Sequence, residues 1–204
     1  MFDLDGKLFE IISRIGDLVL LNILFLICSI PVFTIGASTT ALYSVTKKMA
    51  KNEEGYIAKS YFKAFKENFK QSTIMWLILL VIIAILSADL YIGNYIEKEP
   101  WRTFFKGGIL LAWMIAMFVI IYSLTLQCTF ENTIKNTMKN ALIISLGHAP
   151  WSIVIVILTM SPFIALMQFG QYIAGELLAM MLIWFSGVAY INSFILNRIY
   201  KNYY

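Results

Sequence analysis

Four apolar stretches, each long enough to cross a lipid bilayer, constrain the fold of this chain more than any other feature. They cover residues 73–93, 107–130, 151–169 and 177–197, and Asp89 is the only charged residue inside them. A helix of about 20 apolar residues crosses the roughly 30 Å hydrocarbon core of a membrane. Because lipid offers no partner to an exposed peptide group, such stretches predict membrane-spanning helices.

Composition agrees with this interpretation. Hydrophobic residues make up 60% of the 204 residues and charged residues 14%, whereas about a quarter of the residues in soluble domains are charged. We therefore predict an all-α chain, a polytopic transmembrane helical bundle that forms a single integral membrane domain over residues 1–204. The charges of residues 1–17 are mixed and unlike the basic start of a signal peptide, so we expect the N-terminus to be retained.

The number of spans depends on the segment after a fifth apolar stretch, residues 18–33. A run of small residues, 37–45, follows Pro31 and Gly36 and is either a short second span or a segment outside the membrane. Cytoplasmic loops are enriched in Lys and Arg. If 37–45 crosses, thirteen of the sixteen basic residues fall on one side, and if it does not, eleven do. We therefore expect six spans, the second one short, with both termini cytoplasmic.

Two segments have the pattern of amphipathic helices lying along the cytoplasmic membrane surface. In the first, residues 57–70, aromatic residues gather on one side of a helix and lysines beside them. Such a helix places its rings at the headgroup boundary and its lysines near anionic lipid. The residues expected to do so are Tyr61, Phe62, Phe65 and Phe69, with Lys59, Lys63, Lys66 and Lys70.

The second such segment supports a parallel internal repeat. Residues 66–74 align without a gap with residues 135–143. Upstream of each segment a second similarity occurs, between the Tyr-Ser-Val-Thr of 43–46 and the Tyr-Ser-Leu-Thr of 122–125. Each unit would consist of a helix entering the cytoplasm, an interface helix and a helix leaving it. The alternative is chance similarity between two segments next to the membrane.

The short second helix is a candidate packing surface. Small side chains let a neighbouring helix approach closely, and hydroxyl groups can bond across the contact. We expect this surface to pack against another helix, of the same chain or of a partner, and a bulky replacement such as Ala41→Leu to disturb it. It comprises Gly36, Ala37, Ser38, Thr40 and Ala41.

Few residues have the character of a chemical site. Cys28 and Cys128 are isolated in apolar stretches, His148 is the only histidine, and no metal-ligand spacing or glycine-rich phosphate loop is present. Among polar residues, Asn22 and Asn192 alone are expected deep in the membrane, where a hydrogen bond between helices is favoured over a substrate site. We expect no enzyme activity, no cofactor, no metal site and no nucleic-acid partner.

One part of the chain resembles a known family. The run Thr-Ile-Gly-Ala-Ser-Thr-Thr-Ala-Leu-Tyr at 34–43, the Glu-Glu-Gly-Tyr at 53–56 and the Phe-Lys-rich segment 62–69 are similar to the YesL family, small multi-pass bacterial membrane proteins of unknown function. Relatives often have proline after the glycine, where this chain has Ala37, so the turn geometry there is less fixed.

The resemblance implies a biological context. Members of that family are encoded beside carbohydrate ABC importers and polysaccharide-degrading enzymes in Gram-positive bacteria. It therefore implies an accessory or regulatory subunit in the bacterial cell membrane, in contact with the lipid bilayer and with transmembrane subunits of a sugar importer. The chain lacks the EAA-Gly loop by which importer permeases engage their ATPase, so it is not expected to be the permease. An independent small transporter or exporter is the alternative.

Overall fold

The computed structural model describes residues 4–168 and 173–203, and every regular element within those ranges is helical. In chain order the main helices are α1 (Leu4–Ser29), α2 (Ile35–Met49), α3 (Ile57–Ile92), α4 (Glu99–Gln127), α5 (Ile134–Gly147), α6 (Ala149–Gln168), α7 (Ile173–Ala179) and α8 (Phe185–Tyr200). Single turns η1 (Val32–Thr34), η2 (Gly93–Tyr95) and η5 (Lys201–Tyr203) are 3₁₀ helices, and a π-helical turn, η4 (Met180–Trp184), joins α7 to α8.

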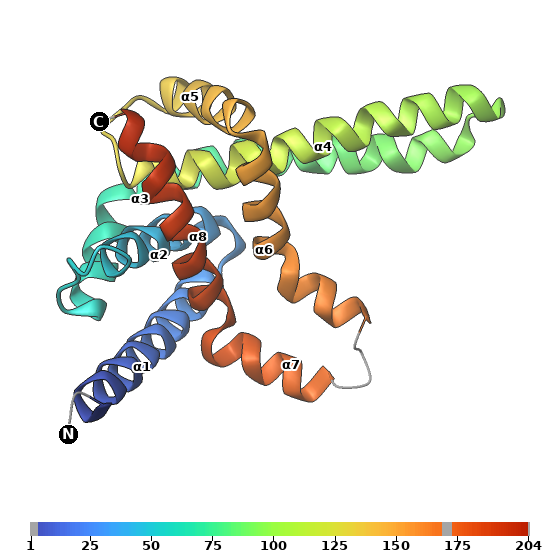
Figure 1. Ribbon diagram of the computed structural model, residues 1–204. Helices are drawn as coiled ribbons and strands as arrows, with labels where there is room; N and C mark the ends of the chain where they lie inside the picture. Colours follow the sequence, from blue (N-terminus) through green and yellow to red (C-terminus); the bar gives the residue numbers. More distant parts are fainter. Residues whose placement is uncertain (1–3, 169–172, 204) are drawn as a thin grey trace.

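Helix α2 lies at the centre of the molecule, where it contacts α1, α3, α4 and α8 (Figure 1). Eleven of its 15 residues are buried. Its small side chains allow its neighbours to approach closely. The core of the protein therefore forms around the shortest and least apolar of the segments predicted to cross the membrane.

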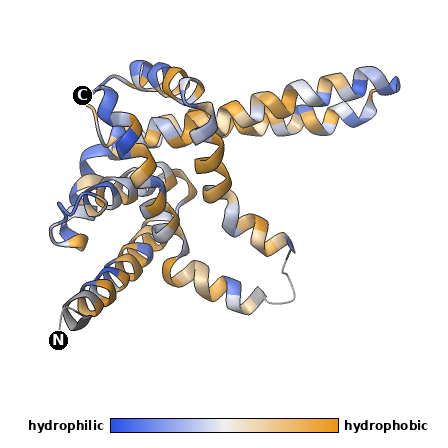
Figure 2. Cartoon of the chain, viewed as in Figure 1, coloured by the Kyte–Doolittle hydropathy of each residue, from blue (hydrophilic) through white to orange (hydrophobic). Residues whose placement is uncertain are grey.

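A two-helix arm extends from this core, formed by residues 73–92 of α3 and 99–115 of α4 (Figure 1). Hydrophobic residues cover most of its length, and hydrophilic ones gather at its tip (Figure 2). Large side chains such as Leu77, Val81, Ile85 and Leu110 are exposed on it. Soluble proteins rarely expose an apolar surface of this extent, so lipid or another membrane protein must cover the arm.

Helices α6 and α7 leave the core in a different direction from the arm (Figure 1). The chain turns at His148, between the end of α5 and the start of α6. Pro150 stands in the first turn of α6, where its missing N–H is tolerated, and Pro162 lies inside the same helix, which continues to Gln168. The arm and α6 therefore diverge as they leave the core (Figure 1).

Five helices are long and apolar enough to cross a membrane, which confirms the prediction of an all-helical membrane protein. They are Leu8–Ser29, Ile57–Tyr95, Glu99–Gln127, Ala149–Gln168 and Ala174–Tyr203. The expected sixth span, 37–45, lies in α2, which is not among them. With 15 residues, α2 is about 22 Å long, shorter than the hydrocarbon core. Residue 169, the last of one predicted span, lies outside the described residues.

The segment 57–70 does not form a separate interface helix. It is the first part of α3, which runs for 36 residues without interruption because residues 57–92 contain neither glycine nor proline. The second expected interface segment, 135–143, lies within α5, a helix of its own whose start is capped by the Thr133 side chain. The two segments therefore differ in how they connect to the helix that follows.

Candidate functional site

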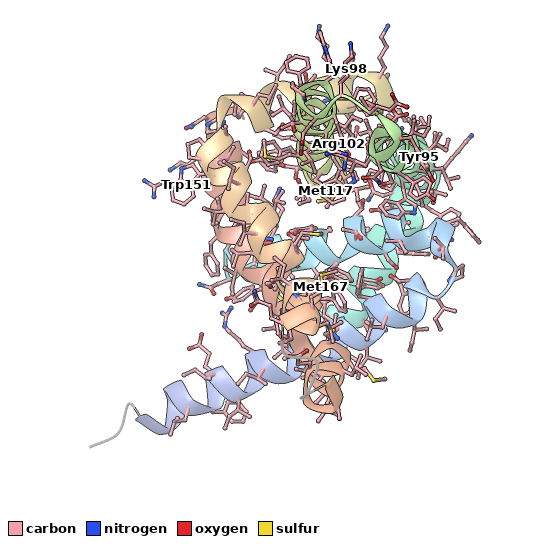
Figure 3. The ribbon with its side chains drawn as sticks, turned by 90° about the vertical axis from the view of Figure 1, so that its right-hand side faces the viewer. Tyr95, Lys98, Arg102, Met117, Trp151 and Met167 are labelled. Carbon is pink, nitrogen blue, oxygen red and sulfur yellow. The ribbon has the colours of Figure 1, made fainter. Side chains whose placement is uncertain are left out.

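An apolar cavity of about 340 Å³ lies where the arm and α6 diverge. Figure 3 views the molecule from the side of the arm's tip, where Tyr95, Lys98 and Arg102 lie, and shows α6 running from Trp151 towards Met167, away from the arm. The apolar walls of the cavity come from α1, α2, α3, α4, α6 and α8. They include Phe25, Leu42, Trp76, Ile83, Met117, Ile120, Leu124, Met160, Phe163, Phe185 and Ala189.

Three hydroxyl groups interrupt this apolar lining: those of Thr39, Tyr43 and Thr159. Behind them, the fully buried Asn192 donates from Nδ2 to the Tyr43 hydroxyl at 3.3 Å and to Thr159 Oγ1 at 3.0 Å. The Oδ1 atom of Asn192 is buried without a hydrogen-bond partner. An unpaired buried acceptor is costly, so this group strongly favours any donor brought to it.

The other deep asparagine has a complete set of partners. Asn22 Nδ2 donates to the backbone oxygens of Met180 and Met181 at 2.9 and 2.8 Å, and its Oδ1 accepts from the Ser186 backbone N–H at 3.0 Å. These are peptide groups of the π-helical turn η4 and of the start of α8, where the regular helical ladder is interrupted. Asn22 therefore joins α1 to this irregular turn, and its polar atoms are not directed at the cavity.

The small-residue surface of α2 packs against α3 of the same chain. A Cβ atom at Gly36 would lie 2.5 Å from Trp76 Cβ and 2.6 Å from the Ser72 backbone oxygen, so only glycine fits there without movement. Thr40 Oγ1 donates to Ser72 Oγ at 2.9 Å, and the Tyr61 hydroxyl donates to Ser38 Oγ at 3.1 Å. Ala37 and Ala41 are fully buried in the same layer. Close packing and paired hydroxyls thus hold α2 to α3.

The aromatic residues of 57–70 do not act as one group. Tyr61 is fully buried, whereas Phe62 and Phe69 are exposed. Phe65 is half-buried and lies between the rings of Tyr61 and Phe69, with centroid distances of 6.3 and 5.4 Å. All four lysines of the segment, Lys59, Lys63, Lys66 and Lys70, are exposed. The prediction that Tyr61 lies at the lipid boundary is wrong, because the residue belongs to the core, and the interface role of the lysines stays a prediction.

The sequence analysis did not single out Tyr43 and Thr159. A signal existed for Tyr43, because it follows Gly36 by seven residues and Thr40 by three and so shares their helix face. None existed for Thr159, whose partner Asn192 lies 33 residues away on another helix. In the part of the chain that the structure describes, no group of three or more His, Cys, Asp or Glu residues is placed to hold a metal ion.

Comparison with known proteins adds one similarity. Residues 18–90 match a family described as a protein of unknown function, DUF624. The match covers roughly a third of the chain, from α1 to the outer part of α3, and includes the α2–α3 contact. No curated protein and no solved structure matches the chain.

Proposed function

We propose that this protein is an accessory or regulatory membrane subunit, without chemistry of its own, that binds the transmembrane part of a carbohydrate ABC importer. The observation that carries the proposal is the apolar cavity between the arm and α6. The sugar-importer context rests on the resemblance of residues 34–43, 53–56 and 62–69 to the YesL family.

Side chains that project from a membrane helix of the partner are the occupants that best fit this space. Lipid tails are as apolar as the cavity walls, so helices associate in a membrane through packing and polar contacts. An unfilled cavity forfeits dispersion contacts, and rigid partner side chains would restore them. One polar side chain of the partner could also reach the hydroxyl groups of Thr39 or Tyr43. A flexible acyl chain would lose more conformational freedom in the same space.

Co-purification tests the proposal directly. The tagged full-length chain, co-expressed with the permeases of a sugar importer from its own genome, is expected to retain them in mild detergent. Ala189 is buried in the cavity wall, so Ala189→Leu should fill part of the cavity and reduce recovery of the permease. Ala84→Leu adds the same volume on an exposed part of the arm and should not.

Photo-crosslinking provides a measurement that does not depend on a stable complex. A photoreactive residue at Met160 should form a crosslink to a permease helix in intact membranes, whereas one at the exposed Ile23 of α1 should label mainly lipid. If the chain never brings down a permease and Met160 labels only lipid, the proposed function is wrong.

For the membrane topology we propose six spans, with α2 as the short second one and both termini in the cytoplasm of a bacterial cell. The clustering of basic segments supports this arrangement. Arg14 donates to Asn52 Oδ1 at 2.5 Å and to the Met49 backbone oxygen at 3.1 Å, so α1 and the α2–α3 loop share one end of the molecule. Asn197 Nδ2 donates to the Lys47 backbone oxygen at 3.0 Å and brings the end of α8 to the same place.

A single cysteine at position 30 decides whether α2 crosses. Ile30 is exposed between α1 and α2. In a background without Cys28 and Cys128, Ile30→Cys should react with a membrane-impermeant maleimide from outside intact cells. Reaction only after the cells are opened would place residue 30 inside and reduce the topology to five spans.

The alternative function, an independent small transporter, is favoured by one observation, the polar cluster of Tyr43, Thr159 and Asn192 at the cavity. A transport path needs polar groups that a substrate can exchange for water. The test is substrate uptake into proteoliposomes that contain this chain alone, with Asn192→Leu as the variant that should abolish it. Uptake by the chain alone would replace the accessory role.

A further inference from the structure

Lys47, near the end of α2, is a buried cation. Its side chain is 7% exposed, its ammonium group lies against Thr129 Oγ1, and Nζ is 4.4 Å from the centroid of the Tyr200 ring. Within the described residues, 4–168 and 173–203, Lys47 has no ion pair within 4.0 Å. One hydroxyl and one aromatic face are therefore the described contacts that compensate the buried charge.

A second, smaller cavity of about 160 Å³ opens beside this ammonium group. It is formed by the end of α2, the α2–α3 loop, the turn after α4 and α8. Three lysines and one acid line it, so its walls carry an excess of positive charge. The lining residues are Ser44, Lys47, Lys48, Lys51, Glu53, Cys128, Thr129 and Asn197.

The electrostatics of this cavity favour an anion. Removing an ammonium group from water costs several kcal/mol, of which a cation–π contact returns about 0.5–2 kcal/mol. The ammonium group of Lys47 is removed from water, and the nearby positive charge of Lys51 repels it. A negatively charged ligand would offset both effects, and the hydroxyl group of Ser44 supplies a further donor.

We propose that this cavity binds a phosphate group through Lys47, Lys48 and Lys51, with Ser44 as a hydroxyl donor. The phosphate belongs either to the headgroup of an anionic lipid or to a soluble phosphate compound. A phosphate needs several convergent donors and a positive potential, and both are present here. The inference is independent of the importer partner, because none of these residues lines the apolar cavity.

The test compares two double variants that remove equal charge. Lys48→Gln with Lys51→Gln changes exposed lysines at the cavity, and Lys98→Gln with Lys201→Gln changes exposed lysines away from it, at the tip of the arm and after α8. Each basic residue near anionic phosphate contributes enough that the first pair should weaken binding about 30-fold. The second pair should leave it within about twofold of the unchanged protein. Lys47→Met should also abolish binding, and the first double variant decides the matter if Lys47→Met fails to fold.

Two binding experiments separate the sources of the phosphate. In the first, the full-length protein in neutral detergent is titrated with inorganic phosphate at constant ionic strength by calorimetry. In the second, it is reconstituted in phosphatidylcholine vesicles with or without phosphatidylglycerol, and native mass spectrometry counts the lipid that stays bound.

Loss of binding in the cavity double variant alone supports the site, and the experiment in which this loss occurs identifies the source of the phosphate. Equal loss in both double variants would reduce the effect to general charge. That result, or the absence of phosphate and lipid binding in both experiments, overturns the proposal.

Discussion

The two units that resemble each other in sequence begin alike in the structure and end differently. Thr46 of α2 donates its hydroxyl to the Leu42 backbone oxygen and lies 2.8 Å from Ser193 Oγ of α8. Thr125 of α4 donates its hydroxyl to the Ile121 backbone oxygen, and its Oγ1 lies 2.6 Å from the hydroxyl of Tyr200, which also belongs to α8. Helix α8 thus holds both Tyr-x-x-Thr segments through equivalent hydroxyl contacts.

Beyond that point the units diverge. Residues 66–74 align without a gap with residues 135–143. When this alignment is continued towards the C-terminus, the Gly-His-Ala-Pro of 147–150 lies opposite the Ile-Leu-Leu-Val of 78–81. The first unit continues as one helix, and the second breaks into α5 and α6. Helices α3 and α6 therefore follow different directions, and both contribute to the walls of the apolar cavity. The difference shows that two segments of similar sequence continue differently where one of them carries a glycine and a proline.

The largest effect should follow from giving the first unit the break of the second. Val81→Pro removes a helical hydrogen bond and introduces a steric clash in α3, at a cost of about 3 kcal/mol or more. Val81 is exposed, so the loss comes from the backbone and not from packing. Spin labels at Lys70 and Ala88 should move closer than the roughly 27 Å of an unbroken helix, and thermal unfolding in detergent should occur at lower temperature.

Val81→Ala is the control and should leave both the label distance and the unfolding temperature nearly unchanged. A proline variant that behaves like this control would show that α3 is already bent in the membrane.

Gly36→Ala should come next, because it tests the contact that holds the first unit to the core. The new methyl group would overlap Trp76 and the Ser72 backbone, which should cost about 1–3 kcal/mol of unfolding free energy. Gly16→Ala is a matched control, since its methyl group would meet nothing within 4 Å and alanine favours helix. Chemical unfolding in mixed micelles measures both. Equal stability of the two variants would contradict the close α2–α3 contact.

A smaller effect is expected from giving the second unit the continuity of the first. Gly147→Ala combined with Pro150→Val removes both helix-interrupting residues, and the space at Gly147 accommodates a methyl group. Labels at the exposed Lys139 and Ile157, which align with Lys70 and Ala88, should then move apart towards the same roughly 27 Å. An unchanged distance would mean that packing around α6 alone maintains the break.

The smallest effects should come from the two threonines that the units share. Thr46→Val and Thr125→Val each remove one contact with α8, and hydrogen bonds between membrane helices contribute about 0.6 kcal/mol on average. Thr→Ser at each position keeps the hydroxyl and serves as control. Similar losses at both sites would support a common origin of the units, and a large loss at only one would separate them.

The sequence was sufficient for features that depend on local composition. Uninterrupted apolar stretches identified the spanning helices, and periodicity placed Lys59, Lys63, Lys66 and Lys70 on one exposed face. Small residues at Gly36 and Ala41 indicated a close helix contact without naming its partner. The same reasoning failed for Tyr61, because an amphipathic face adjoins a protein core or a lipid surface with the same pattern.

The amino-acid sequence by itself determined that this chain is helical and belongs in lipid, because twenty apolar residues in a row have no other stable environment. Tertiary structure decided which helix each face meets. The meeting of Tyr43, Thr159 and Asn192, and that of Lys47 with Thr129 and Tyr200, join residues distant in the chain. Such contacts depend on the directions in which whole helices leave the core, and those directions follow from backbone breaks such as the one before Pro150.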